Sequence, residues 1–244
     1  MSNPFFRFKE FVVHQEGAAM KVTTDACLFG AWAAHDISMQ KKINHVLDIG
    51  AGTGLLSLML AQKTYAPIRG IELDPTAALE AKANVKASPW KDNIEIIQGD
   101  VKEFLAESGT RYDIIISNPP FYEKEIISPD DKKNMAHHGS TLVLDELFDL
   151  VKSNLSPEGK FYLLLPYKRF FTTLALIQKK QLGIFQLTLV RQSLTHGHFR
   201  VMIIGTHAAY SPPTMTRDEI SIRDEHGEYT PAFTDLLKDY YLYL

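Results

Sequence analysis

The chain has 244 residues, a hydrophobic content of 45% and a formal net charge of −3 at pH 7. This length and composition fit one α/β domain with a sizeable core, and the charge argues against a uniformly basic nucleic-acid-binding protein. No apolar run reaches the length of a membrane span, and the single cysteine, Cys27, allows no internal disulfide and no cysteine-rich metal site. We therefore expect a cytoplasmic protein with no membrane or metal partner.

Segments of strand and helix character alternate along the chain. The predicted strands are Ile43–Ile49, Ile68–Leu73, Ile94–Gln98, Tyr112–Ser117, Lys160–Leu165, Phe185–Arg191 and Phe199–Thr206. The predicted helices are Ala26–Ala34, Leu55–Gln62, Asp74–Ala87, Asp100–Glu107, Leu142–Asn154 and Arg169–Lys179. The first helix has Thr24 or Asp25 as its expected N-cap, and Ser156–Gly159 is expected to turn into the fifth strand.

Strands that alternate with helices over short connections form a mostly parallel sheet with helices on both faces. We predict a Rossmann-like α/β fold whose last strand, Phe199–Thr206, is antiparallel, with a ligand at the carboxyl ends of the central strands. The chain is interpreted as a single domain, 1–244, in which residues 37–210 form the core. Residues 1–36 are then an N-terminal extension and residues 211–244 a C-terminal tail.

A glycine-rich segment follows the first strand of the predicted sheet. Asp48 precedes Gly50, Gly52 and Gly54, and closely spaced glycines let the backbone approach a ligand. The spacing Gly-x-Gly-x-Gly differs from the dehydrogenase pattern, and an acid at this position repels a pyrophosphate. It favours a cation, directly or through water, such as the ammonium and sulfonium groups of S-adenosylmethionine.

Acidic side chains also end the second and third strands. Glu72 can accept hydrogen bonds from both hydroxyls of a ribose, and Asp100 can accept one from the amino group of an adenine. Each has a structural alternative, since Asp100 with Glu103 resembles a capping box and Glu72 could be a satisfied strand-end acid. Because Asp48, Glu72, Asp100 and Asn118 end successive strands, one shared site is the simpler explanation.

The fourth strand ends in Asn118-Pro119-Pro120-Phe121. The Asn118 side-chain oxygen and the Pro119 carbonyl can accept the two N–H groups of an adenine amine, which directs the nitrogen lone pair at an electrophile. The two prolines stiffen the backbone, and Phe121 or Tyr122 could stack on an extruded base. Taken alone, an Asn-Pro sequence after an apolar strand is usually only a turn.

Cationic side chains follow this motif. Lys124, Lys132 and Lys133 are predicted to contact RNA phosphates, with His137 as a further substrate contact, while Lys168 and Arg169 follow a later strand near the same rim. On composition alone, solvated loop charges are an equally good interpretation.

These motifs together resemble class I S-adenosylmethionine-dependent methyltransferases. Both ends of the chain are similar to the bacterial tRNA(Val) adenine-37 N6-methyltransferase family. The matching N-terminal positions are Phe8-Lys9-x-Phe11, Ala19 to Val22, Thr24-Asp25 and Leu28-x-Gly30-Ala31-Trp32-Ala33, and the C-terminal ones are Glu228-Tyr229-Thr230, Phe233, Leu236, Asp239 and Tyr241-Leu242. The resemblance implies N6-methylation of the adenosine beside the anticodon, with the Lys21–Asp25 segment closing over the cofactor. It adds Lys21, Thr24, Asp25 and Val101 to the cofactor-binding residues. The chain departs from the family at Thr23, often glycine, and at His137, where many members carry arginine.

Other functions remain open at this stage. The same Asn-Pro-Pro motif serves methyltransferases of protein glutamine and of DNA adenine, but the former usually have a helical domain before the glycine loop, and only 47 residues precede Asp48. No segment is large enough for a separate DNA-recognition domain. A non-catalytic RNA-binding module is a third alternative. His196-Gly197-His198 could suggest a metal, but the predicted turn offers no further ligand.

Overall fold

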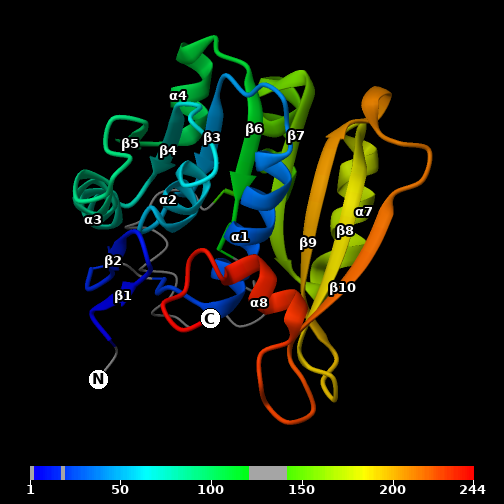
Figure 1. Ribbon diagram of the computed structural model, residues 1–244. Coiled ribbons are helices and arrows are strands. Elements are labelled where there is room, and N and C mark those ends of the chain that lie inside the picture. Colours follow the sequence, from blue (N-terminus) through cyan, green and yellow to red (C-terminus); the bar gives the residue numbers. More distant parts are fainter. Residues whose placement is uncertain (1–2, 18–19, 121–141) are drawn as a thin grey trace, which may run out of the picture.

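The computed structural model describes residues 3–17, 20–120 and 142–244 (Figure 1). The described strands are β1 (Phe5–Arg7), β2 (Val12–His14), β3 (Val46–Ile49), β4 (Ile68–Glu72), β5 (Ile94–Gln98), β6 (Tyr112–Ser117), β7 (Leu155–Pro166), β8 (Leu182–Ser193), β9 (His198–His207) and β10 (Thr216–Arg223). The described helices are α1 (Thr24–Ser38), α2 (Leu55–Ala61), α3 (Pro75–Lys86), α4 (Val101–Ser108), α6 (Leu144–Asn154), α7 (Phe170–Lys179) and α8 (Pro231–Leu237), with short 3-10 turns η1 (Tyr167–Arg169) and η2 (Ala208–Tyr210). None of the described helices is long and apolar enough to cross a membrane.

The main sheet has the order β10-β8-β9-β7-β6-β3-β4-β5. Its strands run parallel except β9, which is antiparallel to both of its neighbours, β7 and β8. This confirms the predicted fold and the antiparallel strand. The sequence did not predict β10, because four consecutive exposed residues, Thr216–Glu219, hide the alternation that leaves only Ile220 and Ile222 buried.

Helices cover both faces of the sheet (Figure 1). One core cluster contains Ile114 and Ile116 of β6 with apolar residues of α1, α2, α3 and α8. The other contains Ile115 of the same strand with residues of α4, α6 and α7. Because neighbouring strand residues point to opposite faces, the Ile-Ile-Ile run of β6 supplies both cores.

Capping residues explain where two of the helices begin. Asp74 caps α3 by accepting from the Ala77 backbone N–H at 2.8 Å, with Pro75 at the first helical position, as predicted. For α1 the predicted caps are wrong, because Thr23 occupies the extended N-cap position and its hydroxyl accepts from the Ala26 N–H at 3.4 Å. The helix therefore contains Thr24 and Asp25 in its first turn.

The expected turn at Ser156–Gly159 lies within strand β7. Tyr112 pairs with Leu155 and Ile114 pairs with Lys160, so extra residues of β7 bulge out between these two pairs. A bulge leaves backbone groups out of the ladder, which is why Pro157 and Gly159 are tolerated inside a strand. The prediction of a separate turn is thus wrong, although its residues mark the irregularity.

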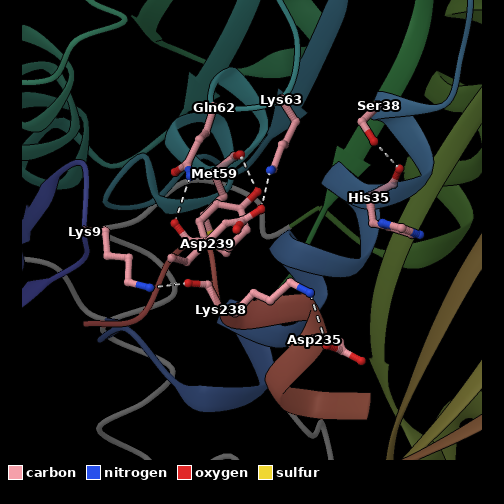
Figure 2. Close-up of polar contacts among 10 residues, drawn as sticks. Lys9, His35, Ser38, Met59, Gln62, Lys63, Asp235, Lys238 and Asp239 are labelled. Carbon is pink, nitrogen blue, oxygen red and sulfur yellow. Dashed lines mark hydrogen bonds and ion pairs between the residues drawn. The ribbon is translucent and has the colours of Figure 1, made fainter. Parts of the chain in front are cut away.

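The C-terminal tail packs against α2 and the N-terminal segment (Figure 2). The Tyr240 hydroxyl donates to the Met59 carbonyl at 3.0 Å, and the Lys63 ammonium lies 2.5 Å from the Asp239 carboxylate. The Lys9 N–H in turn donates to the Tyr240 carbonyl at 2.8 Å. Tyr240 thus docks the tail, and its side chain is fully buried.

Candidate cofactor and substrate site

The predicted site residues meet at the carboxyl edge of the sheet. Ile49 of β3 lies opposite Ile71 of β4 and opposite Ser117 of β6, and Glu72 lies opposite Gln98 of β5. The Ser117 hydroxyl donates to the Ile49 carbonyl at 2.8 Å, which fixes the end of β6 beside the glycine loop. The sheet therefore brings Asp48, Glu72, Asp100 and Asn118 to one edge, as the sequence predicted.

The glycine loop between β3 and α2 is held in a left-handed backbone conformation. Gly50, Gly52 and Gly54 have φ angles of 75°, 55° and 81°. A Cβ at Gly50 or Gly52 would meet no atom within 4 Å, so conformation and not crowding requires glycine there. The loop is thus an open backbone cradle, which suits the close approach of a ligand.

Glu72 connects the glycine loop to the turn between β4 and α3. Its carboxylate accepts from the Gly52 N–H at 2.7 Å and from the Asp74 N–H at 2.9 Å, one bond at each oxygen. The structural alternative for Glu72 is therefore observed. It leaves the ribose role open, since each carboxylate oxygen can accept a second hydrogen bond and the side chain is only half-buried.

Asp48 is completely buried under the loop. One carboxylate oxygen accepts from the Ser57 N–H at 3.1 Å and from the Ser57 hydroxyl at 2.7 Å, which ties β3 to α2. The other oxygen has no hydrogen-bond partner among the described residues. Burial raises the pKa of this carboxyl to about 7, with a smaller contribution from the charge of Glu72 and against the bonds from Ser57. The unpartnered oxygen leaves an acceptor free beside the loop, and a cation bound there would favour the charged carboxylate and lower its pKa.

Asp100 serves as the N-cap of α4. Its carboxylate accepts from the Lys102 N–H at 2.8 Å, so the capping alternative from the sequence is observed here as well. Val101 begins the helix and is buried in the second core cluster. Both residues follow β5 at the edge that carries Glu72, and the half-buried Asp100 retains acceptor capacity beyond the cap.

The Asn-Pro-Pro segment continues directly from β6. Asn118 is half-buried, Pro119 is buried and Pro120 is exposed, so the segment runs from the sheet towards solvent. The remaining predicted substrate residues lie outside the described residues: Phe121, Tyr122, Lys124, Lys132, Lys133 and His137.

The predicted cofactor residues before and within α1 have protein partners. The Lys21 ammonium donates to the Gln15 carbonyl, and the Asp25 carboxylate pairs with the Arg200 guanidinium of β9 at 2.6 Å. Thr24 is exposed at the start of the helix. Because Arg200 lies opposite Pro166 at the carboxyl end of β7, Asp25 lies along the same sheet edge as Asn118.

Asn84 is a site-supporting residue that the sequence analysis missed. Its side-chain amide accepts from the His14 N–H at 2.9 Å and donates to the His14 carbonyl at 2.9 Å and to the Thr53 carbonyl at 3.0 Å. It thereby joins β2 to the glycine loop. The available signal was a polar residue on the apolar face of α3, where Ala81 and Val85 are also buried.

The histidine turn between β8 and β9 forms ordinary polar contacts. His198 Nε2 lies 2.7 Å from a carboxylate oxygen of Glu219, and His196 Nδ1 lies 2.7 Å from the Ser193 hydroxyl. Within the described part of the chain, no three His, Cys, Asp or Glu side chains are grouped to hold a metal ion.

Comparison with known proteins identifies the family. The model of the methyltransferase small domain matches residues 35–169. A tRNA1(Val) (adenine(37)-N6)-methyltransferase of Dyadobacter fermentans is 42% identical, covering 98% of each chain. The chain belongs to this methyltransferase family. Other members include enzymes of the same name from Porphyromonas gingivalis, at 38% identity over 99% of this chain and 96% of the relative, and from Haemophilus influenzae, at 36% over 97% and 98%.

Solved structures share the methyltransferase fold. A protein of Agrobacterium tumefaciens described as a predicted O-methyltransferase has a TM-score of 0.68 at 15% identity, over 88% of this chain and 96% of that chain. A glycopeptide N-methyltransferase solved with S-adenosyl-L-methionine has a TM-score of 0.51 at 12% identity, over 73% and 94%. The family and this fold make S-adenosylmethionine the cofactor, and the open glycine loop above buried Asp48 fits it.

Proposed function

We propose that this protein transfers the methyl group of S-adenosylmethionine to the N6 nitrogen of adenosine 37 in tRNA(Val), beside the anticodon. The observation that carries the proposal is the placement of Asn118 and Pro119 beside the glycine loop, held there by the hydrogen bond from Ser117 to Ile49. The full-length relatives named for this reaction support the choice of substrate. A cytoplasmic location, where tRNA is available, follows from the same proposal.

The cofactor-binding residues are assigned by their positions on the sheet edge. In the proposed complex Asp48 offers negative charge to the methionine end of the cofactor, Glu72 accepts from the ribose, and Asp100 with Val101 borders the adenine. Gly50, Gly52 and Gly54 let the cofactor approach the backbone of the loop closely. Lys21, Thr24 and Asp25 are proposed to close this site, in keeping with a division into a 1–36 extension, a 37–210 core and a 211–244 tail.

The proposed reaction requires hydrogen-bond acceptors for the adenine amino group and the alignment of its nitrogen with the methyl group. When bound, S-adenosylmethionine would supply an activated methyl group to the adenine nitrogen by direct displacement, with S-adenosylhomocysteine as the leaving group. The Asn118 amide oxygen and the Pro119 carbonyl accept the two amino hydrogens, hold the nitrogen in line and favour its lone pair over ring delocalisation. Pro120 keeps the acceptors rigid, and the methylated nitrogen then loses one proton, so no strong base is needed.

Substrate contacts are further proposed for residues after this motif. Phe121, or Tyr122 next to it, stacks on the target base once that base has left its neighbours, a step that costs a few kcal/mol in a single-stranded loop. Lys124, Lys132, Lys133 and His137 contact the RNA. Neutralising the three lysines should flatten the salt dependence of RNA binding, and an unchanged slope would reject their role.

The deciding experiment follows labelled methyl from S-adenosylmethionine into unmodified total tRNA, with nucleoside mass spectrometry and mapping of the labelled fragment. N6-methyladenosine at position 37 of tRNA(Val) supports the proposal completely. Label in protein or DNA but not in tRNA would keep the Asn118 chemistry and overturn the substrate. Cofactor binding without transfer to any of these would favour the non-catalytic alternative.

A further inference from the structure

A row of ring contacts leads from the end of β7 to the surface. Tyr167 of η1 lies 5.3 Å from the His198 ring of β9 and stacks on Phe170 at 6.2 Å, and Phe170 lies 5.3 Å from Phe171, all between ring centroids. Phe170 is buried, whereas Phe171 is 72% exposed. We call these four residues the aromatic ledge. A single exposed ring is ordinary, but this one is the outer end of a packed and therefore rigid row.

The ledge lies at the same edge of the sheet as the proposed acceptors. Leu163 of β7 pairs with Ser117 of β6, and Tyr167 follows Leu163 by four residues. A strand rises about 3.3 Å per residue, so Tyr167 lies roughly 13 Å further along the strand direction than Ser117. It continues from β7, the strand next to β6. In Figure 1, α7, whose first turn contains Phe171, lies behind β8 and β9 at this side of the molecule.

The ledge carries two cationic side chains, which suit it to a polyanion such as RNA. Lys168 and Arg169 stand between Tyr167 and Phe170, and Arg169 has no ion-pair partner within the described ranges. His198 is oriented by Glu219, which also pairs with Arg191, so the polar end of the ledge is fixed by its own contacts. Rigid aromatic faces beside cations bind single-stranded nucleic acid, because bases stack on the rings while phosphates meet the charges.

We propose that the aromatic ledge binds the single-stranded loop of the tRNA next to the target adenosine, with a base on Phe171 and a phosphate on Arg169. This inference rests on the proposed function for the identity of the RNA. It places a second RNA contact on η1 and α7, apart from the Asn118 motif and the segment that follows it. The ledge then holds the loop while the acceptors hold the reacting amine.

The test uses Phe171→Ala and Arg169→Gln with an unmodified tRNA(Val) transcript and with its isolated anticodon stem-loop. Loss of one base stack should raise the dissociation constant and KM for both RNAs roughly tenfold. Arg169→Gln should reduce the slope of log Kd against log salt by about 1, as for one lost phosphate contact. The kcat at saturating RNA and the Kd for S-adenosylmethionine should stay unchanged.

Matched controls lie at the opposite edge of the sheet. Tyr65 is 97% exposed before β4, and Arg111 is exposed directly before β6, so Tyr65→Ala and Arg111→Gln should leave both RNA constants unchanged. Equal effects of Phe171→Ala and Tyr65→Ala overturn the ledge, as does an effect confined to full-length tRNA. Direct RNA binding separates the two proposals, since a wild-type protein that binds both RNAs without methylating them refutes the proposed function alone.

Discussion

Asn118 directly follows Ser117, whose hydroxyl bonds the end of β6 to β3, so a buried central strand positions the Asn118 amide. We predict that Asn118→Ala lowers kcat by about 10²- to 10³-fold, equivalent to about 2–4 kcal/mol, because a preorganised acceptor is lost. Single-turnover methylation of tRNA measures this directly.

The matched variant is Asn118→Asp, which keeps an acceptor oxygen in the same place and should retain more activity than the alanine variant. The Kd for S-adenosylmethionine serves as the control for site integrity. Near-normal turnover by Asn118→Ala with normal cofactor binding would sink the assignment.

Asp48 makes both stability and cofactor binding depend on pH. Its folded pKa of about 7 lies above the usual value for an unfolded aspartate, so the folded state holds the proton more tightly between about pH 4 and pH 7. Its contribution to stability is therefore full below pH 4 and is lost as the pH rises through 7, by an amount on the order of 4 kcal/mol. Chemical denaturation across this range measures the free energy of unfolding of the wild type and of Asp48→Asn. The difference between the two free energies should change with pH.

Burial favours the protonated form of Asp48, whereas a bound cationic cofactor favours the charged carboxylate. We expect the Kd for S-adenosylmethionine to fall between pH 6 and pH 8 in the wild type and to change much less in Asp48→Asn. Parallel pH profiles for the two proteins would show that Asp48 does not sense the cofactor's charge.

Several residues that we propose to bind the cofactor also hold the backbone, and a sequence pattern shows these two roles only as alternatives. Glu72 and Asp100 were predictable as strand-end acids, and the structure adds that both also bind backbone N–H groups. The partners of Asn84 were not predictable, because His14 and Thr53 are 70 and 31 residues away in the chain. Contacts between such distant residues arise only once the helices pack on the sheet.

At the scale of elements, Asn84 connects the N-terminal hairpin to α3 and the glycine loop. We predict that Asn84→Ala lowers the free energy of unfolding by about 1–3 kcal/mol, because His14 and Thr53 lose buried partners. It should also raise the Kd for S-adenosylmethionine and speed amide exchange in residues 12–14.

Asn93→Ala is the appropriate control, since the side-chain amide of Asn93 makes one exposed 3.5 Å contact, with the Tyr65 carbonyl, among the described residues. Unchanged amide exchange in β2 of the Asn84→Ala variant would contradict the proposed connection.

The predictability of an element depended on how much of it is buried. The nearly buried strand β6 has the predicted bounds, and the fully buried β3 ends at Ile49 as predicted but begins at Val46 instead of Ile43. The edge strand β10 was not, because its first half is exposed. The bulge in β7 was taken for a turn, since Pro157 and Gly159 are typical of both.

At the scale of the whole molecule, Tyr240 is one of the buried rings that hold the C-terminal tail against the rest of the protein. Tyr240→Ala should lower the free energy of unfolding by about 3–5 kcal/mol, as for other large aromatic residues removed from a core. Asp239→Ala should cost less than about 1 kcal/mol, because its ion pair with Lys63 is half-exposed (Figure 2). Urea unfolding of both variants measures the contrast.

Tyr240→Phe isolates the hydroxyl, which donates to the Met59 carbonyl, and should cost about 1 kcal/mol. Equal losses for Tyr240→Ala and Asp239→Ala would show that charge, and not burial, holds the tail.

The hydrogen bond from Lys9 to Tyr240 has a consequence for how the protein is made. Translation proceeds from the N-terminus, and domains begin to fold during synthesis. The N-terminal hairpin and α2 therefore leave the ribosome long before the tail that covers them. Until Tyr240 has emerged, the nascent chain lacks the partner of Met59 and Lys9. Docking of the tail on α2 and the N-terminal segment is thus a late event in the biosynthesis of this enzyme.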